Sequence, residues 1–124
     1  MTQCLILERS QEDGKELSAL LGRYGFAAEC MQVSEASAAL DLCRQKMPAL
    51  IFMADQIEGM DSGEFLERLQ VVSRGRPSPK VIVYQEAPDA AAMGRHIWLG
   101  AAECMAKPFD PDIIDLKLRQ VGAL

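Results

Sequence analysis

The sequence predicts an α/β fold of the doubly wound (βα)5 type, and two observations carry that prediction. Short apolar runs rich in strand-forming residues alternate with longer segments of helical period, five times over. Residues 49–54 are almost continuously apolar, which is typical of a central parallel strand buried on both faces. Because crossovers between parallel strands are right-handed, helices should cover both faces of the sheet.

The first half of the chain supplies two strand and helix pairs and the central strand. We expect a strand over Gln3 to Glu8, a helix over Glu12 to Tyr24 that Gly25 ends, and a strand over Ala27 to Val33. Ser34 should then cap a helix that Pro48 stops. Apolar residues at helical spacing predict the buried helix faces, namely Leu17, Leu20, Leu21 and Tyr24, then Ala36, Leu40, Cys43 and Met47.

The second half continues the alternation. After Ala49 to Ala54, a loop over Asp55 to Asp61 leads to a helix, a turn over Ser73 to Pro79 and a strand over Val81 to Tyr84. Pro88 should open a fourth helix that ends at Gly100, and a strand over Glu103 to Ala106 precedes the last helix. The inward residues should be Phe65, Leu66, Leu69 and Val72, then Met93 and Ile97, then Ile114, Leu118 and Val121. We expect one domain over residues 1–124.

Composition excludes several classes of function. The net charge of −5, from 18 acids and 13 bases without a basic cluster, argues against binding to nucleic acid or to an anionic membrane. The sequence has neither an apolar run of membrane-spanning length nor a signal-peptide pattern, so we expect a cytoplasmic protein. The four cysteines lack CxxC spacing and should be buried thiols, with no metal site.

The predicted binding crevice lies beyond the carboxyl ends of the strands. Those ends bring to one rim Glu8 and Arg9, then Ala54 and Asp55, then Gln85 and Glu86, and finally Lys107. Three segments resemble the CheY-like receiver domains of bacterial two-component systems: MPALIFMADQIEGMDSGEFLERL, PKVIVY and GAAECMAKPFD. The resemblance covers the whole chain, is greatest to alphaproteobacterial single-domain receivers, and implies a flavodoxin-like strand order of 2-1-3-4-5.

The resemblance also implies a phosphorylation site that this chain has largely lost. Ala54 stands where the family has its phosphoaspartate, and Gln85 stands where it has a Ser or Thr. Cys104 replaces the usual aromatic switch residue, whereas Lys107 before Pro108 fits the family pattern, in which the following peptide is usually cis. Alanine offers no nucleophile.

Glu8 and Arg9 replace the two acids that hold Mg²⁺ in the family. A guanidinium cannot ligate a hard cation, so we expect weak or absent Mg²⁺ binding and no other cofactor. Glu8, Arg9 and Lys107 together carry a formal charge of +1. We expect Glu8 to pair with Arg9 or Lys107 as a self-neutralised pocket, or the basic excess to admit a partner's carboxylate or phosphate.

Three functions remain open. The first, which we favour, is that the chain is a phosphorylation-independent pseudoreceiver, a non-enzymatic module that binds a histidine kinase, a phosphotransfer protein or an adaptor. Alternatively, Asp55 acts as the phosphoacceptor after a one-residue slip that places Gly63 where the family has its turn glycine. The third possibility is an anion or small-ligand sensor at the crevice.

The fourth helix is a candidate interface. Trp98 points about 100° away from the inward Ile97 and should be at least partly exposed. The resemblance implies partner docking, including possible homodimerisation, through the fourth helix, fifth strand and fifth helix. Gly94 should make that helix less stable, and the single histidine, His96, should be a solvated surface residue.

Overall fold

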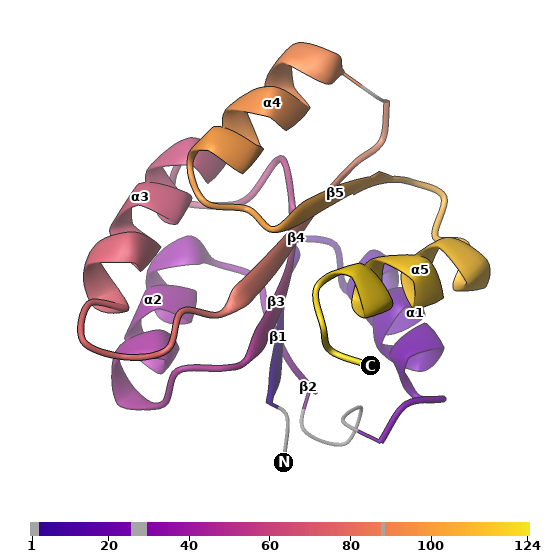
Figure 1. Cartoon of the computed structure of the whole chain (residues 1–124), viewed down its shortest axis with the longest axis horizontal. Coiled ribbons are helices and arrows are strands. Elements are labelled where there is room, and N and C mark those ends of the chain that lie inside the picture. The colour runs from indigo at the N-terminus through magenta and orange to yellow at the C-terminus, as the bar shows by residue number, and fades with distance from the viewer. Residues whose placement is uncertain (1–2, 26–29, 88) are drawn as a thin grey trace.

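The structure, a computed structural model, describes residues 3–25, 30–87 and 89–124, and its centre is a parallel sheet (Figure 1). The strands lie in the order β2-β1-β3-β4-β5, and all four pairings are parallel, so the predicted fold class and strand order are confirmed. Their bounds are β1 Cys4–Leu7, β2 Cys30–Val33, β3 Leu50–Ala54, β4 Lys80–Gln85 and β5 Glu103–Ala106.

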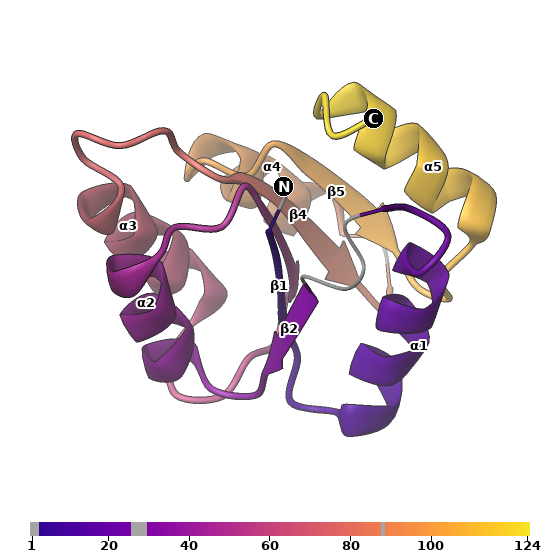
Figure 2. The ribbon, with the colours of Figure 1, turned by 90° about the horizontal axis from the view of Figure 1, so that it is seen from below.

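The helices form a layer on each face of the sheet. Viewed from below, α2 and α3 lie on one side of the strands and α1 and α5 on the other (Figure 2). The bounds are α1 Gln11–Leu21, α2 Ala36–Gln45, α3 Ser62–Val72, α4 Ala90–Trp98 and α5 Pro111–Gln120. In the described residues, four of these helices have an N-cap residue whose side chain accepts a backbone N–H of the first turn. The N-cap residues are Ser10, Asp61, Asp89 and Asp110.

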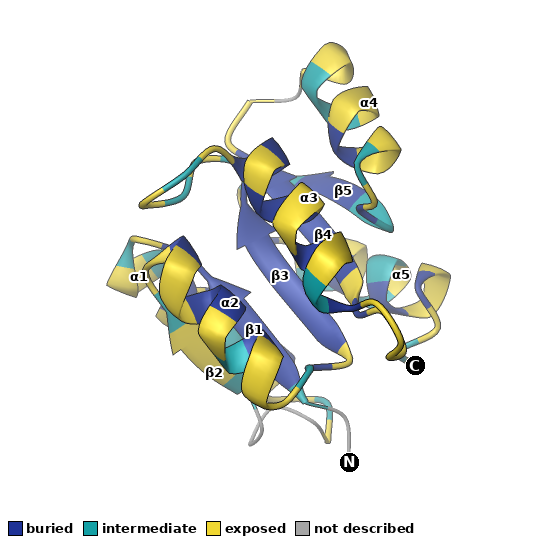
Figure 3. Cartoon of the chain, turned by 90° about the vertical axis from the view of Figure 1, so that its left-hand side faces the viewer, coloured by how far each residue is buried: buried dark blue, intermediate teal, exposed yellow. Residues whose placement is uncertain are grey.

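Strand alternation divides the core into two clusters. Phe52, Ala54 and Tyr84 face α1 and α5, whereas Met53 and Val83 face α2 and α3. The strands β1, β3 and β4 are buried along almost their whole length, while the edge strand β2 is largely exposed (Figure 3). The apolar run at 49–54 was therefore a reliable indicator of the central strand.

Several predicted boundaries were wrong by a few residues. Helix α1 ends at Leu21 and not at Tyr24, because the amide of Gly22 turns back to the carbonyl of Ala19. Helix α2 has Glu35 and not Ser34 at its cap position. The predicted start of β2 at residues 27–29 and the role of Pro88 lie outside the described residues, and Asp89 caps α4.

The predicted orientation of α4 was wrong. His96 is only 2% exposed, whereas Ile97, predicted to face inward, is 47% exposed. Met93 and His96 are three residues apart and share the inward face, which turns both Ile97 and Trp98 outward. In Figure 3 most of α4 is exposed.

Candidate functional site

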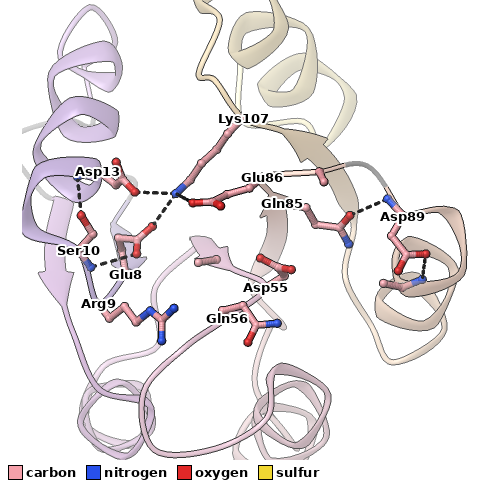
Figure 4. Close-up of a pocket in the computed structure, with 13 residues that line it drawn as sticks. Glu8, Arg9, Ser10, Asp13, Asp55, Gln56, Gln85, Glu86, Asp89 and Lys107 are labelled. Carbon is pink, nitrogen blue, oxygen red and sulfur yellow. Dashed lines mark hydrogen bonds and ion pairs between the residues drawn. The ribbon is translucent and has the colours of Figure 1, made fainter.

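A pocket of about 540 Å³ opens at the carboxyl ends of β1, β3 and β4. The structure brings together there all six pocket residues that the sequence placed at the rim, namely Glu8, Arg9, Ala54, Asp55, Gln85 and Lys107 (Figure 4). Ser10, Asp13, Gln56, Glu86 and Asp89 also line it. The convergence follows from parallel strands, whose carboxyl ends meet at one edge of the sheet.

One half of the pocket, which we name the lysine side, consists of Glu8, Asp13 and Lys107, together with the buried Tyr84 that bonds Glu8. The Lys107 Nζ lies 2.6 Å from Asp13 Oδ2 and 3.5 Å from Glu8 Oε1. The Tyr84 hydroxyl donates a 2.8 Å hydrogen bond to the same Glu8 oxygen. The lysine ammonium lies 5.4 Å from the centre of the Tyr84 ring.

These contacts shift the pKa values of Tyr84 and Lys107 because they lie in a largely buried environment. Glu8 is only 3% exposed, and its second carboxylate oxygen accepts the backbone N–H of Ser10 at 3.1 Å. Burial, and then the bond to Glu8, raise the pKa of Tyr84, so the phenol keeps its proton. Burial alone would lower the pKa of Lys107, but the hydrogen bond to Asp13 and the charge of Glu8 raise it. Lys107 is therefore a cation whose charge is already paired.

The other half, which we name the α4 side, consists of Asp55, Gln85 and Asp89. The Gln85 Oε1 accepts the backbone N–H of Asp89 at 3.1 Å, which fixes the orientation of the amide. The Gln85 Nε2 is buried and has no hydrogen-bond partner among the described residues. The Asp55 carboxylate takes no part in the ion pairs around Lys107, and Figure 4 shows it apart from that network.

Arg9 contributes little to either half. Its guanidinium lies 3.9 Å from Glu58 and is more than half exposed. Of the two partners expected for Glu8, the structure therefore supplies Lys107 and not Arg9, because the side chains of successive residues diverge at the strand end.

The expected basic excess of the pocket was wrong. Five carboxylates and two cations line it, which leaves a formal charge of −3. The expected charge counted only Glu8, Arg9 and Lys107. It left out Asp55 and Glu86 of the same rim, and sequence reasoning missed Asp13 and Asp89. The position of Asp13 could have been predicted from the sequence, because an acid in the first turn of the helix that directly follows β1 must lie at the same edge of the sheet.

The pocket residues do not fit a magnesium site. Both oxygens of Glu8 already have partners, and Asp13 is engaged by Lys107. Among residues 3–25, 30–87 and 89–124 there is no group of three or more His, Cys, Asp or Glu side chains arranged to hold a metal ion. A hard cation needs several free oxygen ligands, which this arrangement does not offer.

Three further residues named from the sequence lie towards α4 and β5. Cys104 is buried, and its thiol approaches the carbonyl oxygen of Met93 at 3.8 Å. Trp98 is 86% exposed. The expected surface position of His96 was wrong: its Nε2 lies 2.9 Å from the hydroxyl of Ser62 at the start of α3, and so ties α4 to α3.

The peptide bond between Lys107 and Pro108 is cis, as the resemblance implied. The model of the response regulator receiver domain matches residues 5–119. The chain belongs to the response regulator receiver family. This receiver chain is 29% identical to sporulation initiation phosphotransferase F of Bacillus subtilis over 98 residues, which cover 79% of the chain and 75% of that protein.

Solved structures of other receivers have the same fold. A putative response regulator from Chloroflexus aurantiacus superposes with a TM-score of 0.85 at 19% identity, covering 99% of this receiver and 98% of that chain. A chain of the co-crystal structure of Saccharomyces cerevisiae Ypd1 with the receiver domain of Ssk1 superposes with a TM-score of 0.86 at 13% identity. The match covers 98% of this receiver and 89% of that chain. No helix in the described part of the receiver is long and apolar enough to cross a membrane.

Proposed function

We propose that this receiver is a phosphorylation-independent module that signals by binding a protein partner. The observation that carries the proposal is the state of the lysine side. Ala54 provides no nucleophile at the end of β3, and Lys107, the cation expected to meet a phosphoryl group, is engaged by Asp13 and Glu8. A phosphoryl group would have to displace a 2.6 Å ion pair, and the described residues offer no group of side chains arranged to hold a metal ion that could assist.

Asp55 is the second candidate, as the acceptor of a phosphoryl group. It lines the pocket, which favours the idea. However, it directly follows Ala54, which faces α1 and α5 together with Tyr84, and successive residues of an extended chain point in opposite directions. Asp55 therefore lies on the α4 side, away from Lys107, so we favour the unphosphorylated mode.

Treatment with acetyl phosphate and Mg²⁺ separates the two modes. Intact-mass spectrometry of the wild-type chain and of Asp55→Asn should show no added phosphoryl group in either, while a receiver with an intact acceptor aspartate is modified under the same conditions. Modification of the wild type that Asp55→Asn abolishes would overturn the proposal in favour of Asp55.

Partner binding is proposed to use the surface of α4, β5 and α5. Trp98 and Ile97 of α4 and Ile113 and Leu116 of α5 are exposed apolar side chains on it. The Ypd1–Ssk1 structure supports a histidine kinase or phosphotransfer protein as the class of partner, with an adaptor or a second copy of this receiver as further possibilities. A nucleic acid or membrane partner is disfavoured by the net charge of −5, and the cytoplasmic location stays a prediction.

Calorimetry with histidine kinases and phosphotransfer proteins of the source organism tests this surface, and sedimentation tests self-association. Trp98→Ser should weaken the binding at least tenfold, the loss expected of a central aromatic anchor. The matched control is Met31→Ser, which alters another exposed apolar residue on β2, at the opposite edge of the sheet from β5. Equal affinities for the wild type and Trp98→Ser would exclude this surface, and binding that requires a phosphodonor would exclude the phosphorylation-independent mode.

An anion or small-ligand sensor is the remaining possibility. The pocket charge of −3 disfavours it, although Gln85, which lines the pocket, has a buried Nε2 without a hydrogen-bond partner among the described residues. A thermal-shift screen with inorganic phosphate and with nucleotides should leave the melting temperature unchanged, and a dose-dependent rise that Gln85→Ala removes would revive this possibility.

A further inference from the structure

Two of the four cysteines face each other across neighbouring strands, far from the pocket. Cys4 is the first residue of β1, Cys30 is the first residue of β2, and the parallel register pairs them directly. Both thiols pack into the cluster that faces α1 and α5. Neighbouring strands lie about 4.8 Å apart, which is within the roughly 4.4–6.8 Å between Cα atoms that a disulfide bond requires.

The two thiols differ in their surroundings. Cys4 is almost fully buried, whereas Cys30 is partly exposed on the edge strand. They interact directly: the Cys4 thiol lowers the pKa of Cys30, while the contact with Cys30 together with burial raises the pKa of Cys4. Cys30 is therefore the thiol that ionises first, and the thiolate is the reactive form.

A small oxidant can reach the pair through Cys30, which is partly exposed on the edge strand β2. The remaining cysteines lack this arrangement, since Cys43 and Cys104 belong to the cluster on the opposite face of the sheet. Burial raises the pKa of Cys43 to about 11 and also raises that of Cys104, which keeps both thiols protonated.

We propose that Cys4 and Cys30 form a redox-modification site that hydrogen peroxide converts to a disulfide bond between β1 and β2. The Cys30 thiolate attacks a peroxide oxygen, the O–O bond breaks and the sulfenic acid and one water form. The Cys4 sulfur then attacks the sulfur of Cys30, the S–O bond breaks and hydroxide leaves with the Cys4 proton as a second water. Two thiols and one molecule of hydrogen peroxide thus give one disulfide and two waters.

The bond would act on the edge of the sheet. Within the described residues, β2 pairs only with β1. A disulfide at the first pair of the ladder closes a loop that contains α1, the helix that carries Asp13 of the lysine side. Oxidation should therefore restrain both β2 and the segment that supports one wall of the pocket.

The test is stoichiometric H2O2 on the folded full chain, followed by blocking of the remaining thiols and cleavage after glutamate. Cleavage after Glu8, Glu29, Glu35 and Glu103 places each of the four cysteines on a different peptide. We expect a linked peptide pair of Cys4 and Cys30, lighter than the two reduced peptides by two hydrogens, with Cys43 and Cys104 still alkylated. A thiol reductant should restore both free thiols.

Two variants identify the order of the steps. Cys4→Ser should stop at the Cys30 sulfenic acid, which dimedone traps, whereas Cys30→Ser should leave Cys4 reduced. The matched control Cys43→Ser alters a buried cysteine outside the pair and should form the bond at the wild-type rate. If a variant does not fold, the wild-type peptide pattern decides alone. Oxidation of Cys30 to the sulfinic acid with Cys4 still reduced, or no linkage of the pair, would overturn the proposal.

Discussion

The two sides of the pocket satisfy their polar groups very differently. On the lysine side the carboxylates and the ammonium of Glu8, Asp13 and Lys107 are paired, and the hydroxyl of Tyr84 is bonded. On the α4 side the buried Nε2 of Gln85 has no partner among the described residues, and the same holds for the buried Nδ1 of His96 in the adjoining helix α4. A fully satisfied network is rigid, whereas an incompletely satisfied and largely exposed helix is the part that can rearrange.

This contrast suggests a division of labour. The lysine side holds Lys107, which the resemblance to other receivers assigns to a phosphoryl group, and its charged groups are paired with one another. The α4 side borders helix α4, which carries the exposed Trp98 and has few buried residues. Binding at α4 would therefore leave the lysine side unchanged, and the following predictions test that separation.

The largest effect is expected for Lys107→Met. Removing the ammonium leaves the carboxylate of Glu8 buried without its charge partner, which should lower the free energy of unfolding by about 3 kcal/mol. Arg9→Met is the matched control, because that guanidinium is exposed and should change stability by less than about 0.5 kcal/mol. Urea denaturation measures both. An equal decrease in the free energy of unfolding for the two variants would show that the ion pairs of Lys107 do not stabilise the fold.

A smaller loss is expected for Tyr84→Phe, which removes one hydrogen bond to a buried carboxylate. The expected cost is about 2 kcal/mol. Tyr24→Phe is the control, because the Tyr24 hydroxyl also bonds a carboxylate, that of Asp115, but in a more exposed position. A loss for Tyr84→Phe no larger than that for Tyr24→Phe would contradict the proposed strength of the lysine-side network.

On the α4 side, stability should depend on the protonation of His96. Burial, and then the neighbouring Arg95, lower the pKa of His96 below the ordinary value near 6.5, so the unfolded chain binds the proton more readily. The stability that neutral His96 contributes is complete above pH 6.5 and is lost as the pH falls towards its folded-state pKa. The slope is at most about 1.4 kcal/mol per pH unit.

The measurement compares the wild type with His96→Gln by urea denaturation between pH 7.5 and pH 5. The difference in stability between them should be constant above pH 7 and should shrink below pH 6.5. A difference that stays constant over the whole range would show that His96 does not titrate differently in the folded chain.

The smallest effect is a gain, expected for Gly94→Ala. A Cβ at Gly94 would meet no atom within 4 Å, so alanine should stabilise α4 by up to about 1 kcal/mol and slow its hydrogen exchange. Gly63→Ala is the contrasting control, since its Cβ would lie 2.9 Å from Asp61 and 3.0 Å from Leu99 and should be destabilising. No slowing of exchange in α4 would mean that helix propensity does not limit its stability.

The sequence predicted the strands correctly, because their apolar runs are clear. It failed to predict which face of α4 is buried, because a shift of one residue along a helix changes the face that points inward. The apolar runs at 49–54 and 81–84 identified central strands, and the carboxyl ends of the strands located the pocket. On α4, however, three consecutive alanines and Gly94 gave little pattern, and Ile97 was assigned to the inward face that His96 occupies.

The chemistry of the pocket was predicted only in part, because its ion pairs join distant segments. Glu8 and Lys107 could be placed at one rim from the ends of their strands, but their neutralisation depends on Asp13 of α1, 94 residues from Lys107. Part of this network could have been predicted from Tyr84, since the hydroxyl of a tyrosine in a buried central strand needs a hydrogen-bond partner. Which carboxylate it would reach requires the packed structure.

The exposure of Trp98 has a practical consequence for spectroscopy. It is the only tryptophan in the chain, and it lies in water on α4 and not in the core. Its emission in the native state should already resemble that of a solvated indole, so intrinsic fluorescence will respond weakly to unfolding. Contact with another protein at α4 would shift the same emission to shorter wavelength, which makes the chain its own optical sensor of docking.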